Sequence, residues 1–243
     1  MRLRRRILLS PIFEEKKKKN NQVEQSFIVQ ALTLDHLSDI LFVQEQIIHS
    51  LPNKEILQPL SKEEFQFILN GNGLMIGAFV DETLIAFRAL LVPQIDEEHL
   101  GLDIGLKVEE LQQVIYQEIS IVLHEYRGNQ LQKTLAILIM QELSQQHHEY
   151  RYVCCTVATS NIPSLKDKFA QGMEILALKE KYNGLMRFIF VKDLQEVNSP
   201  IWNQVTFIRV DDFEAQQAKL AEGWRGFQLE ERNGVQWINY GRR

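Results

Sequence analysis

The sequence predicts a mixed fold of helices and strands, either α/β or α+β. Residues 27–32 alternate apolar and polar side chains like a strand, whereas residues 34–48 repeat apolar side chains at helical spacing. The stretch 114–146 joins both patterns, because the apolar run VIYQEISIVL leads through HEYRGN into the uninterrupted helical run QLQKTLAILIMQELSQQ. A chain of 243 residues of which 45% are hydrophobic can bury a full core, in one domain with an appendage or in two small domains.

Charge is distributed unevenly along the chain. Residues 1–27 carry eight Lys or Arg against three Glu, so with a net charge of −5 for the whole chain the remainder carries −10. An acidic body argues against nucleic acid as a partner, because that binding depends on clustered cations. Residues 1–26 are expected to form a basic, flexible tail. No apolar run is long enough for a membrane span or a signal peptide, so we expect a cytoplasmic protein.

Helix start signals place two helices in the first part of the chain. Thr33 follows the predicted strand 27–32 and is placed to cap a helix that runs to about residue 48. The run Ser61-Lys62-Glu63-Glu64 has the spacing of a capping box. A second helix is therefore expected from about Lys62.

A hairpin and a loop follow. Strands are expected at 74–80 and 83–92, joined by the turn Asp81-Glu82. Residues 93–106 lack a strong period and predict a functional loop, which leads through a short helix near 108–113 into the strand at 114. The acidic residues of this loop could attract a cationic amine or form a solvated surface cluster. They are Asp96, Glu97, Glu98 and Asp103.

Beyond residue 146 the alternation of strands and helices continues. A strand is expected at 152–157, then a helix capped by Asn161 and ended by Gly172, then strands at 174–178 and 185–191.

The last 45 residues start a new pattern. A strand at 205–210, a helix at 213–222 and a hairpin around Asn233-Gly234 are expected. So short a segment is too small to be stable alone. We therefore expect residues 199–243 to form a β-α-β-β appendage that packs on the main sheet or on a second copy of the chain.

The turn between residues 123 and 131 is suited to hold an anion. The first four N–H groups of a helix have no partner within it, and the helix dipole adds about half a positive charge at that end. Gly128 allows a close approach of the backbone, and Arg127 can add a cation. A plain strand-turn-helix, in which the same two residues only end the strand, would show the same local pattern.

Two motifs give the chain a family resemblance. Arg127-Gly128-Asn129-Gln130-Leu131-Gln132, entered through His124-Glu125-Tyr126, resembles motif A of the GNAT superfamily of N-acetyltransferases, usually written Q/R-x-x-G-x-G/A. Asn161-Ile162-Pro163-Ser164, followed by Gly172-Met173, resembles the later N-x-x-A/S helix of that family. The similarity spans about residues 27–194. It implies a mixed α/β (α+β) fold whose mostly antiparallel sheet has helices on both faces, with residues 27–198 as an acetyltransferase domain.

The resemblance also implies a site for acetyl-CoA as co-substrate, and no metal. By their positions in the motifs, the residues of this site would be Ile121, Val122, Leu123, Arg127, Gly128, Asn129, Gln130, Leu131, Gln132, Asn161, Ser164 and Lys168.

The sequence departs from the family pattern at three of these positions. Gln130 stands where a second Gly is usual, and Gln132 where Gly or Ala is usual, so both side chains must point away from any pyrophosphate. Backbone donors survive such changes, although close approach becomes harder. Lys168 stands where the family often has a Tyr that protonates the leaving thiolate. The general acid is therefore unassigned.

Glu118 is the candidate catalytic residue. It lies nine residues before Arg127, where similar enzymes place a carboxylate that deprotonates the acceptor amine directly or through water. The alternative for Glu118 is a structural carboxylate paired with an Arg or Lys. The resemblance further implies an oxyanion donor on the same strand, a backbone N–H near Leu123. His124 is a weaker candidate and is expected to hydrogen-bond within the turn.

These features favour an acetyl-CoA or acyl-CoA-dependent N-acyltransferase that acts on a primary amine, in a small molecule or at a peptide end. The alternative is a CoA-binding module without turnover, which the three departures would permit. Expected partners are the amine substrate and, as an open alternative, a second copy of the chain. Cys154 and Cys155 are neighbours in an apolar strand and are interpreted as packing residues, not as a disulfide, metal pair or nucleophile.

Overall fold

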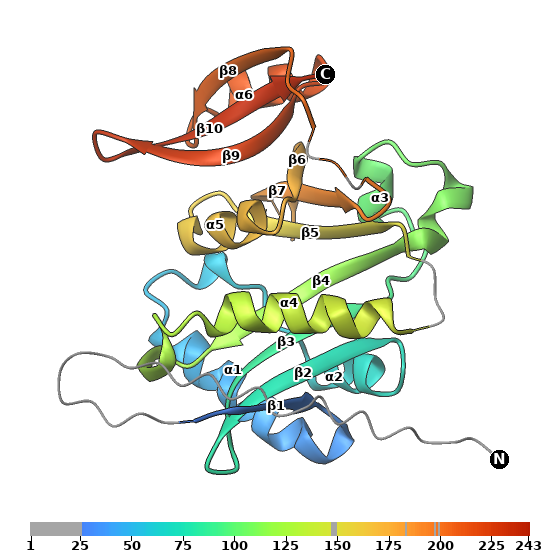
Figure 1. Cartoon of the computed structure of the whole chain (residues 1–243), viewed down its shortest axis with the longest axis vertical. Coiled ribbons are helices and arrows are strands. Elements are labelled where there is room, and N and C mark those ends of the chain that lie inside the picture. Colours follow the sequence, from blue (N-terminus) through green and yellow to red (C-terminus); the bar gives the residue numbers. More distant parts are fainter. Residues whose placement is uncertain (1–25, 147–149, 183, 197, 199) are drawn as a thin grey trace. The chain divides into compact units, whose positions relative to one another are not determined.

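The computed structural model describes residues 26–146, 150–182, 184–196, 198 and 200–243 (Figure 1). The expected basic tail lies outside these residues apart from Ser26. The described chain divides into two compact units. Unit 1 holds residues 26–52, 59–92 and 118–146, and unit 2 holds residues 53–58, 93–117 and the described residues from 150 to 243.

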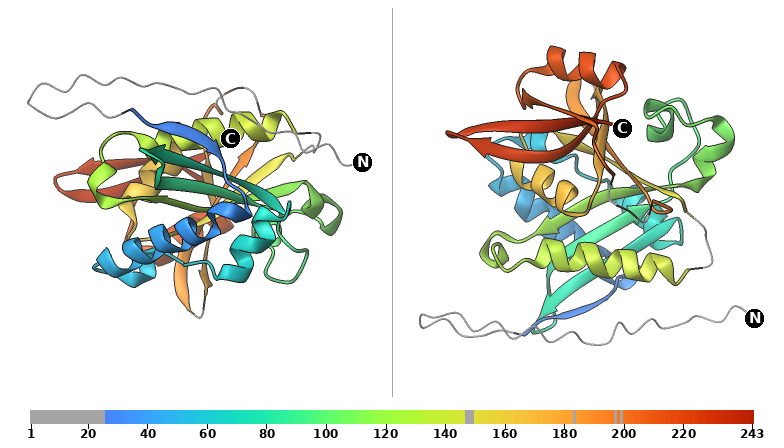
Figure 2. Two further views of the ribbon diagram at one scale, coloured as in Figure 1. Left: turned by 90° about the horizontal axis from the view of Figure 1, so that it is seen from below. Right: turned by 45° about the horizontal axis from the view of Figure 1, so that its top comes forward.

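Unit 1 is a sheet covered by three helices. Its strands occur in the order β1-β2-β3-β4 and are β1 (Ile28–Ala31), β2 (Gly73–Val80), β3 (Thr83–Leu91) and the second half of β4 (Val114–Val122). Its helices are α1 (Leu37–Ser50), α2 (Lys62–Leu69) and α4 (Leu131–Ser144). Helix α4 covers one face of β2 and β3, and α1 and α2 cover the other, as the left view of Figure 2 shows.

The start signals of unit 1 are confirmed. The Thr33 hydroxyl accepts the Asp35 N–H and caps a 3-10 turn, η1 (Leu34–His36), which continues directly into α1. The capping box at α2 is complete, because Ser61 Oγ accepts the Glu64 N–H and Glu64 Oε2 accepts the Ser61 N–H at 2.7 Å. The β2–β3 turn, Asp81-Glu82, has φ of 46° and 65°, the left-handed values that a tight hairpin turn needs.

Unit 2 contains the first half of β4 and six further strands. The order is β4-β5-β7-β6-β9-β10-β8, with β4 and β5 parallel and the other registered pairs antiparallel. The further strands are β5 (Tyr152–Ala158), β6 (Glu174–Lys181), β7 (Leu185–Asp193), β8 (Gln204–Arg209), β9 (Arg225–Arg232) and β10 (Val235–Arg242). Its helices and 3-10 turns are η2 (Lys54–Ile56), α3 (Leu100–Asp103), η3 (Val108–Gln113), α5 (Ile162–Ala170) and α6 (Phe213–Ala221).

The loop 93–106 is more ordered than its sequence predicts. It contains α3, and His99 caps this helix, since Nδ1 accepts the Gly101 N–H at 3.0 Å. The Tyr116 hydroxyl accepts the Leu100 N–H at 2.5 Å. Burial lowers the pKa of His99, which keeps the ring neutral and Nδ1 free to accept. A four-residue helix carries too few apolar repeats for a pattern to reveal it.

The C-terminal β-α-β-β segment packs on strand β6 within unit 2. Gly226 of β9 pairs with Ile175, and a side chain there would meet Ile175 and Ile238 at 3.0–3.2 Å, so glycine allows the close approach. Helix α6 contacts β6. Inside the segment, the buried Tyr240 hydroxyl donates to Gln216 Oε1 at 2.7 Å, and Gln216 Nε2 donates to the Val210 carbonyl at 2.8 Å.

Deleting residues 199–243 is expected to reduce solubility or to change the oligomeric state. The deletion exposes the apolar side chain of Ile175 and removes both Arg225 and Arg243 from Glu174, which they contact at 3.0 and 3.2 Å. Size-exclusion chromatography and thermal melting would measure the effect. A truncated protein that stays monodisperse with an unchanged melting temperature would contradict this expectation. As a control, Arg209→Gln, a surface change in the same segment, should behave like the parent.

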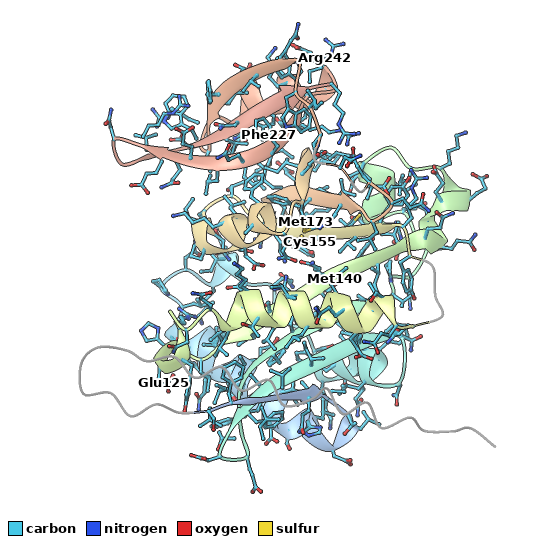
Figure 3. All side chains as sticks on the ribbon, viewed as in Figure 1. Glu125, Met140, Cys155, Met173, Phe227 and Arg242 are labelled. Atoms are coloured by element: carbon cyan, nitrogen blue, oxygen red, sulfur yellow. The ribbon has the colours of Figure 1, made fainter. Side chains whose placement is uncertain are left out.

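The predicted element order and mixed α/β class are confirmed. Figure 3 shows Cys155 on β5, and both cysteines are buried free thiols. In the described part of the chain, no helix is both long and apolar enough to cross a membrane.

Candidate active site

The turn between β4 and α4 lies wholly in unit 1. After a 3-10 turn, η4 (His124–Tyr126), the chain is extended at Arg127 and then left-handed at Gly128, with φ of 81°. Gln130 is also left-handed, with φ of 58°, and directly precedes the first residue of α4. Figure 3 labels Glu125 in this turn.

This turn presents a row of unused backbone donors. Among the described residues, the N–H groups of residues 128–133 donate to no acceptor; the first N–H bonded into the helix is that of Thr134, which donates to the Gln130 carbonyl at 2.9 Å. Gln130 makes no side-chain cap to α4. The helix start therefore keeps its free donors and its partial positive charge, which together favour an anion.

Three side-chain hydrogen bonds hold the turn in place without using its free N–H groups. Asn129 Nδ2 donates to the Tyr126 carbonyl at 3.0 Å, and Arg127 Nε donates to the Val122 carbonyl at 3.3 Å. Arg88, buried on β3, donates from Nη1 to the Gln132 carbonyl at 3.3 Å. Each of these bonds uses a carbonyl, so the N–H groups stay available.

The space in front of Gly128 is open. A Cβ atom at this position would have no protein atom within 4 Å, so the glycine is needed for its left-handed φ and not to avoid a neighbour. Free N–H groups, a glycine and open space fit the pyrophosphate of a nucleotide co-substrate.

Gln130 departs from the family pattern without changing the backbone. It adopts the left-handed conformation that explains why glycine is usual there, and its side chain is exposed. This conformation costs a residue with a side chain roughly 1–2 kcal/mol.

Gln130→Gly should therefore leave thermal stability equal or higher, whereas Gln130→Val should lower the free energy of unfolding by about 1 kcal/mol or more, because a β-branched residue strongly disfavours positive φ. Thermal melting of the two variants would measure the difference. Equal melting temperatures would show that the turn does not require the left-handed conformation.

The N–H of Leu123 itself is already bonded. It donates to the Ile85 carbonyl at 3.0 Å, so Leu123 does not supply a free donor, and an oxyanion donor elsewhere near Leu123 stays a prediction. Strand β4 still pairs with β3 at this point, and the sequence gives no signal of where that pairing ends. The buried Ile121 and the half-buried Val122 end β4, and the buried Leu123 joins β4 to η4.

Glu118 has the electrostatic character of a base that works near neutral pH. Burial, and to a smaller extent the negative charge of Glu64 on α2, raise its pKa to about 7. None of the ion pairs among the described residues includes Glu118, which argues against the alternative of a carboxylate paired with an Arg or Lys. A carboxylate with a pKa near the working pH can accept a proton efficiently.

Asn161 and Ser164 form the predicted helix start in unit 2. Asn161 Oδ1 accepts the Ser164 N–H at 3.1 Å and so caps α5. The amide of Asn161 also donates to the Ile56 carbonyl at 3.2 Å, which ties η2 to this helix.

Lys168 is buried in a polar network of unit 2. Its ammonium group donates to Gln117 Oε1 at 2.6 Å and lies 3.6 Å from Asp167 Oδ2. Gln117 in turn donates to Gln171 Oε1 at 2.8 Å. The side chain at the position of the usual Tyr is thus a cation held by polar neighbours.

Two of the four acidic side chains of the loop, Glu98 and Asp103, form ion pairs within unit 2. Asp103 lies 2.8 Å from both Lys179 and Lys181, and Lys181 also lies 3.1 Å from Glu98. Asp96 caps the Glu98 N–H with Oδ1, at 2.9 Å. The ion pairs favour the interpretation of this cluster as a structural surface feature over an amine site.

Gln117 and Arg187 are not among the residues predicted from the sequence, and Glu64 is predicted only as part of a capping box. Arg187 could have been found in the same way as Glu118, because it is also a charged residue within an apolar strand, LMRFIFV. The influence of Glu64 on Glu118 follows from tertiary packing alone. In the described chain, no group of three or more His, Cys, Asp or Glu side chains could hold a metal ion.

No protein-family model matches this sequence, and no curated protein matches it significantly. Solved structures, in contrast, show the class of fold, since many of those that match are acetyltransferases. One is described as an acetyltransferase of the GNAT family from Streptococcus pneumoniae, with a TM-score of 0.51 at 14% identity over 69% of this chain and 99% of that chain.

Two further matches have more specific names. Arabidopsis thaliana NAA60, in complex with acetyl-CoA, gives a TM-score of 0.54 at 18% identity over 69% of this chain and 98% of that chain. The ribosomal-protein-S18-alanine N-acetyltransferase from Escherichia coli gives 0.52 at 13% identity, over 72% and 99%. The chain therefore has the fold of the GNAT N-acetyltransferases, as its motifs predict.

Proposed function

We propose that the protein is an acyl-CoA-dependent N-acyltransferase that acts on a primary amine, with residues 27–198 as its catalytic domain and residues 199–243 as an appendage. The observation that carries the proposal is the row of free N–H groups at residues 128–133, in the same unit as Glu118 with its pKa of about 7. The fold supports it, since 69–72% of this chain aligns with nearly the whole length of acetyltransferases.

The co-substrate would supply an acyl group activated as a thioester. The donors of residues 128–133 would hold its pyrophosphate, and the dipole of α4 would add to their effect. We also predict that the co-substrate contacts Asn161, Ser164 and Lys168. No metal is part of the proposal.

Glu118 would take a proton from the acceptor ammonium, directly or through water, and so produce the neutral amine that can attack. Its raised pKa matches this task, because a carboxylate with an ordinary pKa is too weak a base to take a proton from an ammonium group near pH 7.

The release of free thiol from acetyl-CoA in the presence of a panel of primary amines tests the proposal. Amine-dependent thiol release would support it. Binding of acetyl-CoA without thiol release for any amine would favour the second candidate, a CoA-binding protein without turnover. The observation that favours this second candidate is Lys168, whose ammonium is fixed on Gln117 where the family often has a Tyr that supplies the proton.

A further inference from the structure

Arg187 is a buried cation that lacks a carboxylate partner. It lies on β7 between Ala158 of β5 and Lys179 of β6, and only 3% of its surface is exposed. Its Nη2 donates to the Glu55 carbonyl at 2.6 Å. Its Nε is buried and has no acceptor among the described residues, and none of the ion pairs in that part of the chain includes Arg187.

Such an arrangement is unusual for a charged group. Buried charges are normally paired, because their transfer out of water is costly. A guanidinium group has five N–H donors in a planar fork that matches a carboxylate, and Arg187 uses one of them on a neutral carbonyl. Burial lowers its pKa, and electrostatic interactions with Tyr182 and Glu55 oppose this change. The remaining donors are suited to an anionic ligand.

Tyr182 covers the Arg187 guanidinium. The Tyr182 ring lies over the guanidinium, 5.5 Å from its central carbon, and its hydroxyl is 3.0 Å from Thr156 Oγ1. Tyr182 is 42% exposed and stands in the β6–β7 turn with a left-handed φ of 51°. Because Arg187 is itself buried, a ligand would reach the guanidinium by displacing this exposed ring.

The same cluster is joined to the predicted co-substrate residues of unit 2. Glu55, whose carbonyl binds Arg187, is followed by Ile56, whose carbonyl accepts the Asn161 amide. One short 3-10 turn, η2, thus bonds both to Arg187 and to the start of α5. An acceptor bound at Arg187 would lie beside the segment that carries the second family motif.

We propose that Arg187 binds the carboxylate of the acceptor, so that the acceptor is a primary amine that also carries a carboxylate group. The reaction of such an acceptor rests on the proposed function. Its binding does not, and the two can be tested separately.

The test uses the full-length protein without acyl-CoA and a series of ω-amino acids, from glycine to 6-aminohexanoate, each paired with its amide. Isothermal titration calorimetry should show that at least one acid binds about tenfold or more tightly than its amide, as expected for hydrogen bonds to a charged group. Arg187→Gln should remove this preference, and Arg187→Lys should weaken it because the fork is lost. Arg209→Gln is the matched control and should keep it.

Equal binding of acid and amide by the parent, including binding of neither at millimolar concentration, would overturn the proposal without the use of a variant. Retention of the full preference in a folded Arg187→Lys protein would also overturn it. If the acids bind but no thiol is released from acetyl-CoA, the site at Arg187 stands and the proposed acyl transfer fails.

Discussion

Replacement of Glu118 by Gln should lower turnover about a hundredfold or more at neutral pH and leave the affinity for acetyl-CoA nearly unchanged. The amide fills the same space but cannot accept a proton. The variant should regain rate as pH rises, because alkaline solution supplies the neutral amine that Glu118 otherwise generates. Steady-state rates of thiol release at a series of pH values, together with the Kd for acetyl-CoA, would measure both effects.

The dependence of the parent's kcat/KM on pH is a second test of the role of Glu118. Since burial raises the pKa of Glu118 to about 7, the basic form is absent well below that value and complete well above it, so kcat/KM should rise through an apparent pKa of about 7. Glu64→Gln removes the neighbouring negative charge and should move this midpoint to lower pH. Gln can replace Glu in a capping box, so α2 should stay intact.

Equal rates for the parent and Glu118→Gln from neutral to alkaline pH would remove Glu118 from the mechanism. Direct attack by an amine that is already deprotonated would then be the simpler account. A uniform loss of rate at every pH would instead point to a role in folding.

Replacement of Gly128 by Asp should abolish the thermal shift that acetyl-CoA produces. The side chain would enter the open space in front of the free N–H groups, and its charge would repel a pyrophosphate. Gly128→Asn is the matched control, because Asn has nearly the same size and also tolerates a left-handed φ. It should retain more of the shift than Asp, and the difference isolates the charge.

The apo forms of both variants should fold, since no protein atom lies within 4 Å of the added Cβ, and they should lose similar stability, because both side chains must adopt the left-handed φ of 81°. A Gly128→Asp protein that shows the full acetyl-CoA shift would mean that the pyrophosphate binds elsewhere.

Local signals in the sequence predict most of the elements. The capping box at Ser61, the cap at Asn161 and the Asn233-Gly234 hairpin all occur where their chemistry predicts them, because each depends on residues a few positions apart. The strand-turn-helix at residues 114–146 belongs to the same group. Its backbone keeps the left-handed conformation at Gln130, although the sequence alone indicates only that a side chain at this position makes close approach harder.

Features that depend on distant residues could not be predicted in this way. Three such features join segments far apart in the chain. They are the hydrogen bond from the Leu123 N–H to the Ile85 carbonyl, the effect of Glu64 on the pKa of Glu118, and the ion pairs between Asp103 and the lysines of β6. A single sequence carries no spacing signal for such contacts. Arg187 is an intermediate case. The sequence shows that it is a charged residue within an apolar strand, but only the structure shows that it has no carboxylate partner among the described residues.

A crystal structure of the protein with CoA would show where the pyrophosphate binds. We expect its oxygens within hydrogen-bond distance, about 2.7–3.2 Å, of backbone nitrogens between Gly128 and Lys133. Well-ordered CoA with its pyrophosphate bound away from this turn, and with those N–H groups facing solvent, would contradict it.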